Sequence, residues 1–394
     1  MNQLQSDILI IGGGLTGLLA AFVLSSTHKD IIIVDKNDFI NISQNNNDFR
    51  TTAISEGSKL FFEKVGLWKH LAKYAEPINK INVYDRNVSR KINFQNFNSK
   101  DYLGYVIKNI LLKKNLIRLI GLKKNIKILS NSNLKNIIFF NDNIEAIFHQ
   151  NKINTKLLIA SDGKNSFVRN FLKTPTYKKK YKHQAMVINL QHSKNHNNIA
   201  YELFLKSGPL AILPAKSNSK YFYCSSIIWS NTNFFSYNLN QINQILLKDI
   251  IEEKINKYIG KIIKILDKQC FDLSAHLNTK FYSDRLIYIG DSAHSIHPIA
   301  GQGWNLGVRD IKNVLVSINE GITLGLDIGC PFVCKKYHDL SFYDAYLLFQ
   351  ITDKLNSIFL NEKIDMQILR QQGFSFIENN FKVKKFISNF AMGL

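Results

Sequence analysis

Asp7-Ile-Leu-Ile-Ile-Gly-Gly-Gly-Leu-Thr-Gly17 is a short apolar run followed by a glycine-rich turn. Residues 8–11 are typical of a buried strand, and the apolar residues from about Leu15 to Ser26 indicate a helix. A second apolar strand follows at Ile31–Val34 and ends at Asp35. A strand, a helix and a second strand in this order predict two neighbouring parallel strands, which are typical of α/β domains.

The glycines of this turn have the Gly-x-Gly-x-x-Gly spacing of dinucleotide-binding turns. Gly12 permits the tight turn, Gly14 lets a pyrophosphate approach the backbone, and Gly17 lets the helix pack closely on the sheet. Asp35, about 20 residues further on, can accept hydrogen bonds from an adenosine ribose. The unit predicts a dinucleotide site but does not distinguish FAD from NAD. We assign this site to Gly12, Gly14, Leu15, Thr16, Gly17 and Asp35.

The composition is that of a globular protein. The chain has 394 residues, of which 45% are hydrophobic and 21% are charged. This length suggests about two domains and allows a large core. The composition excludes collagen, a coiled coil, a disordered chain and a disulfide scaffold. Four cysteines without regular spacing indicate a reducing compartment.

The formal net charge of +21 has two explanations. Lys, Asn and Ile are abundant, and because A/T-rich codons encode all three, genome composition accounts for part of the charge. The second explanation is an anionic partner, such as a phospholipid surface. Lys dominates over Arg, and no basic stripe contains aromatic residues, so we expect no nucleic-acid partner.

The apolar segment 7–24 is not expected to be a signal peptide or a membrane helix. No basic region precedes it, and four glycines would break a spanning helix. We therefore expect a cytoplasmic protein that is soluble or peripheral to a membrane.

Two later segments combine glycines with carboxylates. An expected strand at 157–160 leads into Ser161-Asp162-Gly163, and a second at 286–289 leads into Gly290-Asp291. The latter continues to Gly301-Gln302-Gly303-Trp304-Asn305, where a further helix is expected to begin. Between these motifs, residues 175–280 contain mainly strand patterns with one helix near 240–265. Helices are also expected at 56–65, at about 105–119 and from 304 to the end, with a break near 325–331.

Together, the three motifs resemble those of the class A FAD-dependent monooxygenases, relatives of para-hydroxybenzoate hydroxylase. The sequence is most similar to the ubiquinone-biosynthesis hydroxylase family within that group. The resemblance covers nearly the whole chain. It includes the segments Asp48–Ser55, Tyr181–Gln184, Gly208–Pro214, Thr352–Leu355 and Ala391–Gly393.

The resemblance implies an α/β fold, α+β overall. A Rossmann-like FAD-binding domain would carry an inserted, mainly antiparallel β substrate domain and C-terminal helices. We expect residues 1–174 and 281–335 to form the discontinuous FAD-binding domain. Residues 175–280 would form the substrate domain, and residues 336–394 the C-terminal helical region.

The resemblance also implies roles for residues outside the first glycine turn. Asp162 and Gly163 would contact the FAD pyrophosphate, and the Asp291 carboxylate suits the ribityl hydroxyls, which donate hydrogen bonds. A helix beginning near Asn305 would stabilise the negative charge of reduced flavin. Trp304 replaces a smaller apolar residue of the family, and would either narrow the space at the flavin ring or stack on it. The expected cofactor residues of this part are Arg50, Arg118, Asp162, Gly163, Asp291, Gly301, Gln302, Gly303, Trp304 and Asn305.

The activity implied by the resemblance is hydroxylation of an aromatic ring. NAD(P)H would reduce FAD, and O2 would give a C4a-hydroperoxyflavin whose distal oxygen is attacked by the ring. The implied substrate is a polyprenylated phenol intermediate of ubiquinone biosynthesis, with Gly208–Pro214 as a wall of its pocket. Because such a substrate lies in the membrane, we expect peripheral association with an anionic inner-membrane surface. Other ubiquinone-biosynthesis proteins would be further partners.

Two alternatives stay open at this point. One is a flavoprotein with another reaction, either a hydroxylase of a soluble phenol or an isoprenoid reductase. The other is a catalytically silent FAD-binding scaffold of a biosynthetic complex. The sequence identifies no base for the phenol; His297 is a weak candidate for proton transfer, and otherwise holds the backbone or lines the flavin edge. No metal site is expected, because Cys330, Cys334 and His338 form a row of only three ligands.

Overall fold

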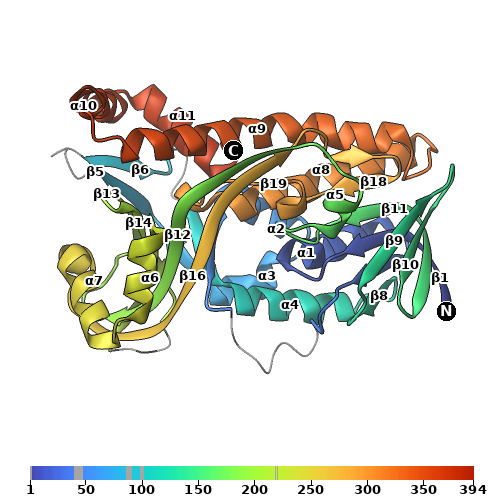
Figure 1. The fold of residues 1–394 in the computed structure, drawn as a ribbon, viewed down its shortest axis with the longest axis horizontal. Coiled ribbons are helices and arrows are strands. Elements are labelled where there is room, and N and C mark those ends of the chain that lie inside the picture. The colour runs from blue at the N-terminus through green and yellow to red at the C-terminus, as the bar shows by residue number, and fades with distance from the viewer. Residues whose placement is uncertain (1, 40–47, 86–90, 98–101, 218, 220) are drawn as a thin grey trace.

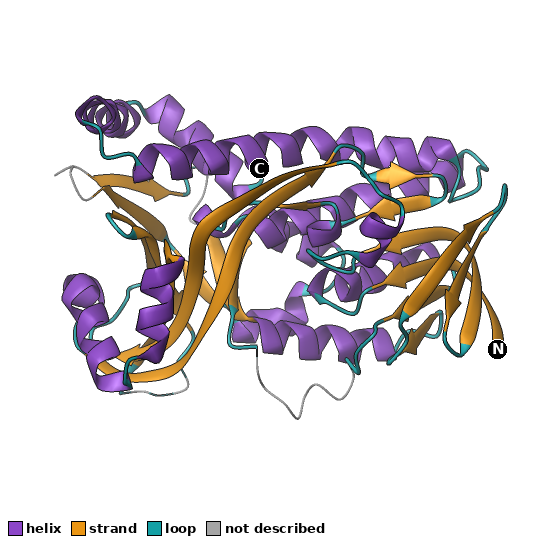
Figure 2. Cartoon of the chain, in the orientation of Figure 1, coloured by secondary structure: helices purple, strands orange, loops and turns teal. Residues whose placement is uncertain are grey.

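The computed structural model describes residues 2–39, 48–85, 91–97, 102–217, 219 and 221–394 (Figure 1). The Asn-rich linker 41–47, for whose path the sequence gives no guidance, lies outside the described residues. Within the described part, two eight-stranded sheets and one three-stranded sheet are flanked by helices (Figure 2). This confirms the predicted α/β fold.

The first sheet contains the predicted strand-helix-strand unit. Strands β18, β11, β1, β2 and β8 lie side by side in this order and run parallel. β17 pairs antiparallel with β18, and β9 and β10 extend the sheet from β11 as antiparallel strands. The strands are β1 Asn2–Ile11, β2 Ile31–Val34, β8 Ile126–Leu129, β9 Leu134–Phe139, β10 Ile144–Phe148, β11 Asn151–Ala160, β17 Tyr282–Ser283 and β18 Leu286–Tyr288.

The parallel strands form the centre of the larger hydrophobic core. Residues 8–11 of β1 and all of β2 are buried, as expected for strands that are covered on both faces. Helix α1 is buried from Gly17 to Leu24 and packs against both α4 and α8. The helices of this part are α1 Leu15–Leu24, α2 Glu56–Lys64, α3 Trp68–Leu71, α4 Asn109–Gly121, α5 Phe167–Phe171, α8 Gly303–Thr323 and α9 Pro331–Leu360.

A small sheet replaces the first turn of one predicted helix. The helix expected from about residue 105 begins only at Asn109, and β7 Gly104–Lys108 precedes it. β7 pairs with β3 Thr51–Ser55 on one side and β4 Glu76–Ile78 on the other. The prediction was wrong here because Tyr105, Val106 and Ile107 fit a pleated, half-buried sheet better than an isolated helix start.

The second sheet is mainly antiparallel. Its order is β19-β16-β12-β15-β14-β13-β5-β6, and the 17-residue strands β12 and β16 cross the middle of the molecule (Figure 1). Helices α6 Asn233–Gln241 and α7 Gln244–Ile259 pack on one face and form a second core with it. The strands are β5 Lys80–Asp85, β6 Lys91–Gln95, β12 Thr176–His192, β13 Ile199–Leu205, β14 Gly208–Ala215, β15 Tyr223–Thr232, β16 Ile262–Asn278 and β19 His294–Ser295.

Two features differ from the predicted division into domains. Residues 80–85 and 91–95, expected in the FAD-binding domain, form β5 and β6 and extend the second sheet, because β5 pairs parallel with β13. The boundary expected between residues 335 and 336 falls inside the continuous helix α9. Beyond α9, helices α10 Ile364–Asn379 and α11 Phe381–Met392 complete the chain.

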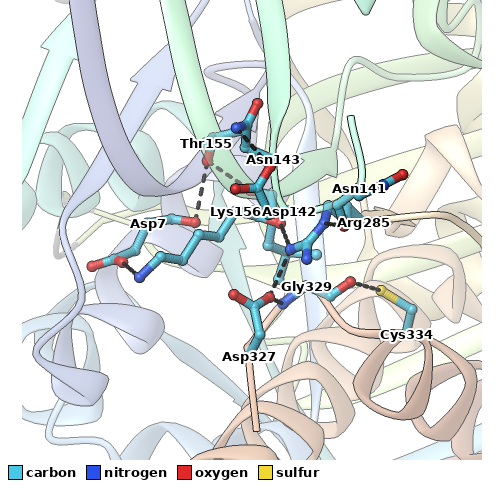
Figure 3. A network of polar contacts seen from close by, with 11 residues as sticks. Asp7, Asn141, Asp142, Asn143, Thr155, Lys156, Arg285, Asp327, Gly329 and Cys334 are labelled. Atoms are coloured by element: carbon cyan, nitrogen blue, oxygen red, sulfur yellow. Dashed lines mark hydrogen bonds and ion pairs between the residues drawn. The ribbon is translucent and has the colours of Figure 1, made fainter. Parts of the chain in front are cut away.

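A polar network fixes the turn between α8 and α9 to the first sheet (Figure 3). Arg285 donates hydrogen bonds to the carbonyl oxygens of Asn141 (2.9 Å) and Lys156 (3.2 Å), and forms an ion pair of 2.7 Å with Asp327. Gly329 lies so close to the sheet that a Cβ atom on it would be 2.0 Å from the Lys156 carbonyl oxygen. These contacts anchor one end of α8, whose other end belongs to the candidate site.

Candidate functional site

The ends of three parallel strands bring the glycine-containing motifs together. β1, β11 and β18 are neighbours, so the segments that follow them start at the same edge of the sheet. A Cβ atom on Gly12 would lie 2.4 Å from the Ser161 carbonyl oxygen, and one on Gly290 would lie 2.9 Å from the Thr16 side chain. Both glycines also have positive φ values, 114° and 57°. Close approach and backbone conformation therefore both require glycine at these two contacts.

The turn after β1 leaves open space at one glycine only. A Cβ atom on Gly17 would be 1.9 Å from the Gly12 carbonyl oxygen, whereas nothing described lies within 4 Å of one on Gly14. No side chain caps the start of α1, and its first turn contains no acidic residue. Free backbone amides and the helix dipole favour an anion at this place. The turn therefore has the shape and the charge that a pyrophosphate needs.

Asp35, at the end of β2, holds the glycine turn from one side. Its Oδ2 accepts a hydrogen bond of 2.7 Å from the Gly13 amide, and its Oδ1 accepts one of 2.8 Å from the Asn37 amide. A carboxylate oxygen has two lone pairs, so both oxygens keep the capacity to accept a ribose hydroxyl.

A lysine that the sequence analysis missed lies beside this carboxylate. Burial lowers the pKa of Lys113 on α4, and the nearby charges of Asp35 and Asp48 oppose this shift. Arg118, predicted to face the cofactor from the same helix, lies 3.5 Å (Nη2 to Nδ1) from His70 in an exposed position, and its role stays a prediction. One lysine among many on an amphipathic helix carries no motif, so only the structure distinguishes Lys113.

The loop after β11 contains a carboxylate oxygen without a partner. Asp162 Oδ2 accepts a hydrogen bond from the Val168 amide (3.1 Å), while its Oδ1 is buried and finds no hydrogen-bond partner among the described residues. Burial raises the pKa of Asp162. Gly163 follows with a φ of 84°, and nothing described lies within 4 Å of the place that a Cβ atom on it would take. An unpaired buried acceptor beside open space fits the contact with a ligand that donates a hydrogen bond.

Arg169 organises this loop from the inside. The side chain is 5% exposed and donates to the carbonyl oxygens of Lys164 (2.5 Å) and Ser292 (3.2 Å). It also lies 2.8 Å from His276 Nε2, which must accept because a guanidinium only donates. Arg169 therefore connects the Asp162 loop to the loop that carries Asp291.

The Asp291 side chain is exposed to solvent, yet the surrounding protein reduces the hydration of its charge. Burial raises its pKa, and the positive charges of His294, Arg50 and Lys164 oppose the shift. A side chain that is open to solvent but surrounded by protein lies in a concave part of the surface. The three motifs thus place carboxylates at one edge of the sheet, and cations lie near the one at Asp291.

Arg50 is held in place by two contacts. Its Nε and Nη2 donate to both carboxylate oxygens of Asp48 (2.8 and 2.9 Å), and its guanidinium lies 5.1 Å from the centre of the Phe271 ring. Asp48 also raises the pKa of Arg50, with a smaller contribution from Asp291. Half of the side chain remains exposed, and its charge interacts with that of Asp291, so an already oriented planar cation lies near this carboxylate.

The start of α8 resembles the start of α1. Gln302 precedes the helix without capping it by a side chain, and the first turn has no acidic residue. Gly301 has a φ of 61°, and a Cβ atom on it would approach Ala53 to 3.2 Å. The amides of Gly303 and its neighbours are therefore free to face a second negative charge.

Gln302 and Asn305 hold this loop rather than present free side chains. Asn305 Oδ1 accepts from the Ser55 amide and the Ser58 hydroxyl, both at 2.9 Å, and its Nδ2 donates to Ala53. Gln302 donates to the carbonyl oxygen of Ala391 at 2.9 Å. The predicted contacts of Gln302 and Asn305 with the cofactor would therefore be made by their backbone atoms.

Trp304 packs into the protein. Its ring lies 5.7 Å from the ring of Phe62 on α2, at an interplanar angle of 59°, and it joins the edge of the larger core. The two predicted alternatives, a narrowed flavin space or a stack on the flavin ring, both stay predictions.

The two histidines of this loop differ in their surroundings. His294 Nε2 lies 2.7 Å from Asp310 Oδ2, which also accepts from the Gly290 amide, so His294 and Asp310 together hold the backbone of this loop. His297 is 1% exposed, and its Nδ1 has no hydrogen-bond partner among the described residues. Burial lowers the pKa of His297 to about 4, and its ring packs edge-on against Tyr181. A neutral imidazole with a free nitrogen keeps the capacity to accept a proton.

The row noted in the sequence, Cys330, Cys334 and His338, makes packing contacts and hydrogen bonds within the protein. His338 Nδ1 accepts from the Phe281 amide at 3.4 Å, and Cys334 is buried. In the part of the chain that the structure describes, no group of three or more potential ligands is placed to hold a metal ion.

The arrangement fits a flavin dinucleotide. Two uncapped helix starts face the same strand edge and offer sites for separated negative charges. The carboxylates of Asp35 and Asp291 can accept from sugar hydroxyls, and Arg50 and Lys113 supply positive charge for phosphates. The model of the FAD binding domain family matches residues 5–323. The chain belongs to this family. FAD is therefore its cofactor.

Curated relatives of the chain span nearly its whole length. A ubiquinone hydroxylase, UbiL, from Rhodospirillum rubrum is 26% identical over 389 residues, which cover 98% of this chain and 90% of the relative. A mitochondrial ubiquinone biosynthesis monooxygenase, COQ6, from Dictyostelium discoideum is 24% identical, with coverage of 98% and 91%.

Solved structures show the same fold. p-Nitrophenol 4-monooxygenase PnpA from Pseudomonas putida superposes with a TM-score of 0.78 at 15% identity, covering 98% of this chain and 97% of that one. PqsL, a probable FAD-dependent monooxygenase from Pseudomonas aeruginosa, gives a TM-score of 0.76 at 14% identity, with coverage of 94% and 100%.

Proposed function

We propose that the chain is an FAD-dependent hydroxylase that uses NAD(P)H and O2 and acts on a polyprenylated phenol of ubiquinone biosynthesis. The observation that carries the proposal is the recess at Asp291, where two uncapped helix starts, a desolvated carboxylate and an oriented arginine converge. The names of the curated relatives, which match over nearly the full chain, support the choice of reaction and substrate.

Each group of the recess has a part in holding the cofactor. The amides at the start of α1 bind the pyrophosphate next to Gly14, and Asp35 accepts from the adenosine ribose. Asp291 accepts from the ribityl chain, while Arg50 and Lys113 balance the phosphate charge. The amides at the start of α8 stabilise negative charge on the ring system. Bound FAD supplies hydride acceptance from NAD(P)H and the subsequent reaction with O2.

The second sheet supplies the wall of the substrate site. β14 contains the expected segment Gly208–Pro214, and its residues Ala211 and Leu213 lie on the sheet face away from α6 and α7. A mostly apolar wall of this kind accommodates an aromatic ring and excludes water from it.

A membrane surface is the proposed place of action. Within the described residues, no helix is long and apolar enough to cross a membrane. Six large apolar side chains of α10 and α11 are at least half exposed, and they are Ile364, Ile368, Leu369, Phe376, Phe381 and Phe386. Lys363 and Lys382 are exposed beside them, and the whole chain carries a net charge of +21. Apolar side chains flanked by lysines fit peripheral binding to an anionic bilayer, where other enzymes of the same biosynthesis are further partners.

One experiment separates the proposal from its alternatives. Purified protein receives NAD(P)H, labelled O2 and a prenylated phenol in anionic vesicles, with a soluble phenol in a parallel reaction. We expect one labelled oxygen atom in the prenylated ring. Label in the soluble phenol alone would favour the first alternative, and reduction of an isoprenoid without O2 would favour a reductase. No NAD(P)H oxidation with any substrate would favour the silent scaffold.

A further inference from the structure

A row of partly exposed side chains crosses the second sheet. The strand registers align Glu202 with Ala211, Ala211 with Ile228, Ile228 with Val187, and Val187 with Gln269. Paired residues point to the same face, so the row Glu202-Ala211-Ile228-Val187-Gln269 lies on one side of five neighbouring strands. Glu202, Ala211 and Ile228 are partly exposed although their strands have a partner on both sides at these residues, whereas Val187 is buried and Gln269 lies where β16 pairs only with β12.

Among the described residues, those on the opposite face of these strands are closely covered. Leu203, Ile212, Ile227 and Ile188 alternate with the row along the same strands, and each is at most 3% exposed beneath α6 and α7. Partial exposure in the centre of a sheet, on one face only, indicates a hollow along that face.

Two contacts show that this face turns toward the FAD recess. Asn189, two residues from Val187 and therefore on the same face, donates a hydrogen bond of 2.6 Å to the Phe49 carbonyl oxygen. Phe271, two residues from Gln269, lies under the guanidinium of Arg50. The row thus lies on the side of the sheet from which Arg50 and the cofactor residues are reached.

Glu202 ends the row between two apolar groups. On one side, Ala200 packs with Met392, whose neighbour Ala391 is bonded to Gln302 at the start of α8. On the other side, the ring of Phe204 stacks on that of Phe359, with centroids 3.4 Å apart. Within the described residues, no hydrogen bond or ion pair reaches the Glu202 side chain.

The other carboxylates of this face have partners. Asp267 accepts a hydrogen bond of 2.7 Å from Asn189, and Asp85 forms an ion pair with Arg370. Asp85 is the charged residue of β5 that lies nearest to Glu202 in the strand register, and its ion pair with Arg370 of α10 neutralises both charges. Burial raises the pKa of Glu202 to about 7, so this carboxyl group can exchange a proton at neutral pH.

We propose that Glu202 is the general base that accepts the proton of the substrate's phenolic hydroxyl. This inference rests on the proposed function, because it names the base of that reaction. The O–H bond of the phenol breaks, the proton moves to the carboxylate, and the electron pair stays on the oxygen as a phenolate. Delocalisation of this pair into the ring gives the electron-rich carbon that attacks an electrophilic oxygen. The neutral carboxyl group then returns its proton to water.

The test compares Glu202→Gln with Glu202→Asp and with the control Glu253→Gln, which changes an exposed carboxylate on α7. Two substrates are used: a prenylated phenol with an ordinary hydroxyl pKa, and its nitro analogue, which is already ionised at pH 7.5. For the ordinary phenol, we expect Glu202→Gln to slow hydroxylation roughly 100-fold or more. For the ionised analogue, the rate should stay within a few-fold of the wild type. Glu202→Asp should restore part of the rate with the ordinary phenol.

Two further readouts separate a base from a structural residue. Ultraviolet difference spectra should show the phenolate band when the wild type binds the ordinary phenol, and no band with Glu202→Gln. FAD content and unfolding temperature should match those of the control variant. Equal rates for Glu202→Gln and the wild type, or equal loss with both phenols, would overturn the inference. If the wild type hydroxylates neither phenol, the proposed function fails, and this inference fails with it.

Discussion

Arg370 on α10 donates from Nε to Asp85 Oδ2 on β5 across 2.6 Å, and the two side chains are 1% and 2% exposed. Nη1 of the same arginine donates to the carbonyl oxygens of Ile358 (2.9 Å) and Asn361 (2.7 Å) at the end of α9. One buried cation therefore joins the second sheet to two C-terminal helices.

Replacement of this arginine alone should destabilise the protein strongly. Arg370→Met leaves the Asp85 carboxylate buried without its cation, a change that costs about 3–5 kcal/mol in comparable sites. The double variant Arg370→Met/Asp85→Leu removes both charges and should recover most of that loss. Urea unfolding monitored by circular dichroism measures both. If the double variant is as unstable as the single one, the ion pair is not what holds α10.

The two glycines of the first turn should respond differently to a side chain. Gly14→Val places its side chain in open space, at a φ of −73°, so the protein should fold and lose FAD. Gly17→Ala places a Cβ atom 1.9 Å from a backbone oxygen, so it should lower the unfolding temperature itself. FAD content after gel filtration and thermal unfolding of the apo forms check this pair. A Gly14→Val protein that stays fully yellow would contradict the assignment of the pyrophosphate position.

Asp291→Ala should weaken FAD binding without weakening the fold. Loss of hydrogen bonds to a charged acceptor corresponds to about 1.5–3 kcal/mol, or roughly 10- to 100-fold in affinity. Because burial raises the pKa of Asp291, its charge is unfavourable in the protein without ligand, and removal should not lower the unfolding temperature of the apo form. The control is Asp284→Ala at an exposed carboxylate. Unchanged FAD affinity in a fluorescence titration would remove Asp291 from the site.

Acid should destabilise the protein through His276. Burial, Arg169 and His294 lower the pKa of His276 to about 3, whereas an unfolded histidine titrates near 6.5. The unfolded chain therefore binds the additional proton below pH 6.5, and the free energy of unfolding falls as the pH drops toward 3. The slope for one such group is at most about 1.4 kcal/mol per pH unit.

The matched variant for this effect is His276→Gln, whose amide oxygen can still accept from Arg169. Its free energy of unfolding should fall less steeply than that of the wild type between pH 6.5 and 4. Parallel curves for the two proteins would show that another group dominates the acid response.

Membrane binding should depend on the aromatic residues of α10 and α11. Phe376 and Phe386 are 60% and 70% exposed, and burial of each ring in the bilayer is worth about 1.5 kcal/mol or more. Phe376→Ser/Phe386→Ser should lower the affinity for anionic vesicles roughly 100-fold in sedimentation assays. Tyr237→Ser on α6, a residue with similar exposure, should have no effect. Equal losses for both proteins would place the contact elsewhere, and binding that does not weaken at high salt would contradict an electrostatic contribution.

The parts of the fold that depend on local patterns could be predicted from the sequence. The structure contains the glycine turn, the expected helix at 56–65 and the two strands that lead into Asp162 and Asp291. The ends of the helix and of the strand before Asp291 differ from the expected ends by one residue. These elements combine an apolar run with a glycine or a cap, so their neighbours in sequence determine them. The expected convergence of the motifs also follows from the rule that parallel strands end at one edge.

The parts that depend on distant partners could not be predicted in this way. β5 pairs with β13, which lies more than a hundred residues away, and no local signal assigns it to the second sheet. Lys113 and Glu202 are ordinary charged residues in sequence and become distinctive only in the fold, Lys113 through burial beside Asp35 and Asp48, and Glu202 through burial alone. Arg118 on the same helix as Lys113 lies beside His70 in an exposed position, and its expected contact with the cofactor stays a prediction.

The parallel pairing of β5 with β13 has a consequence for synthesis of the protein. The ribosome completes β5 at Asp85 and β13 at Leu205, which at 5–20 residues per second is a delay of about 6–24 s. During this time the backbone amides and carbonyls along one side of β5 have no strand to pair with, and such an edge can recruit other chains. Slowing translation between residues 85 and 199 should therefore lower the yield of soluble protein, and chaperones that cover nascent strands should restore it.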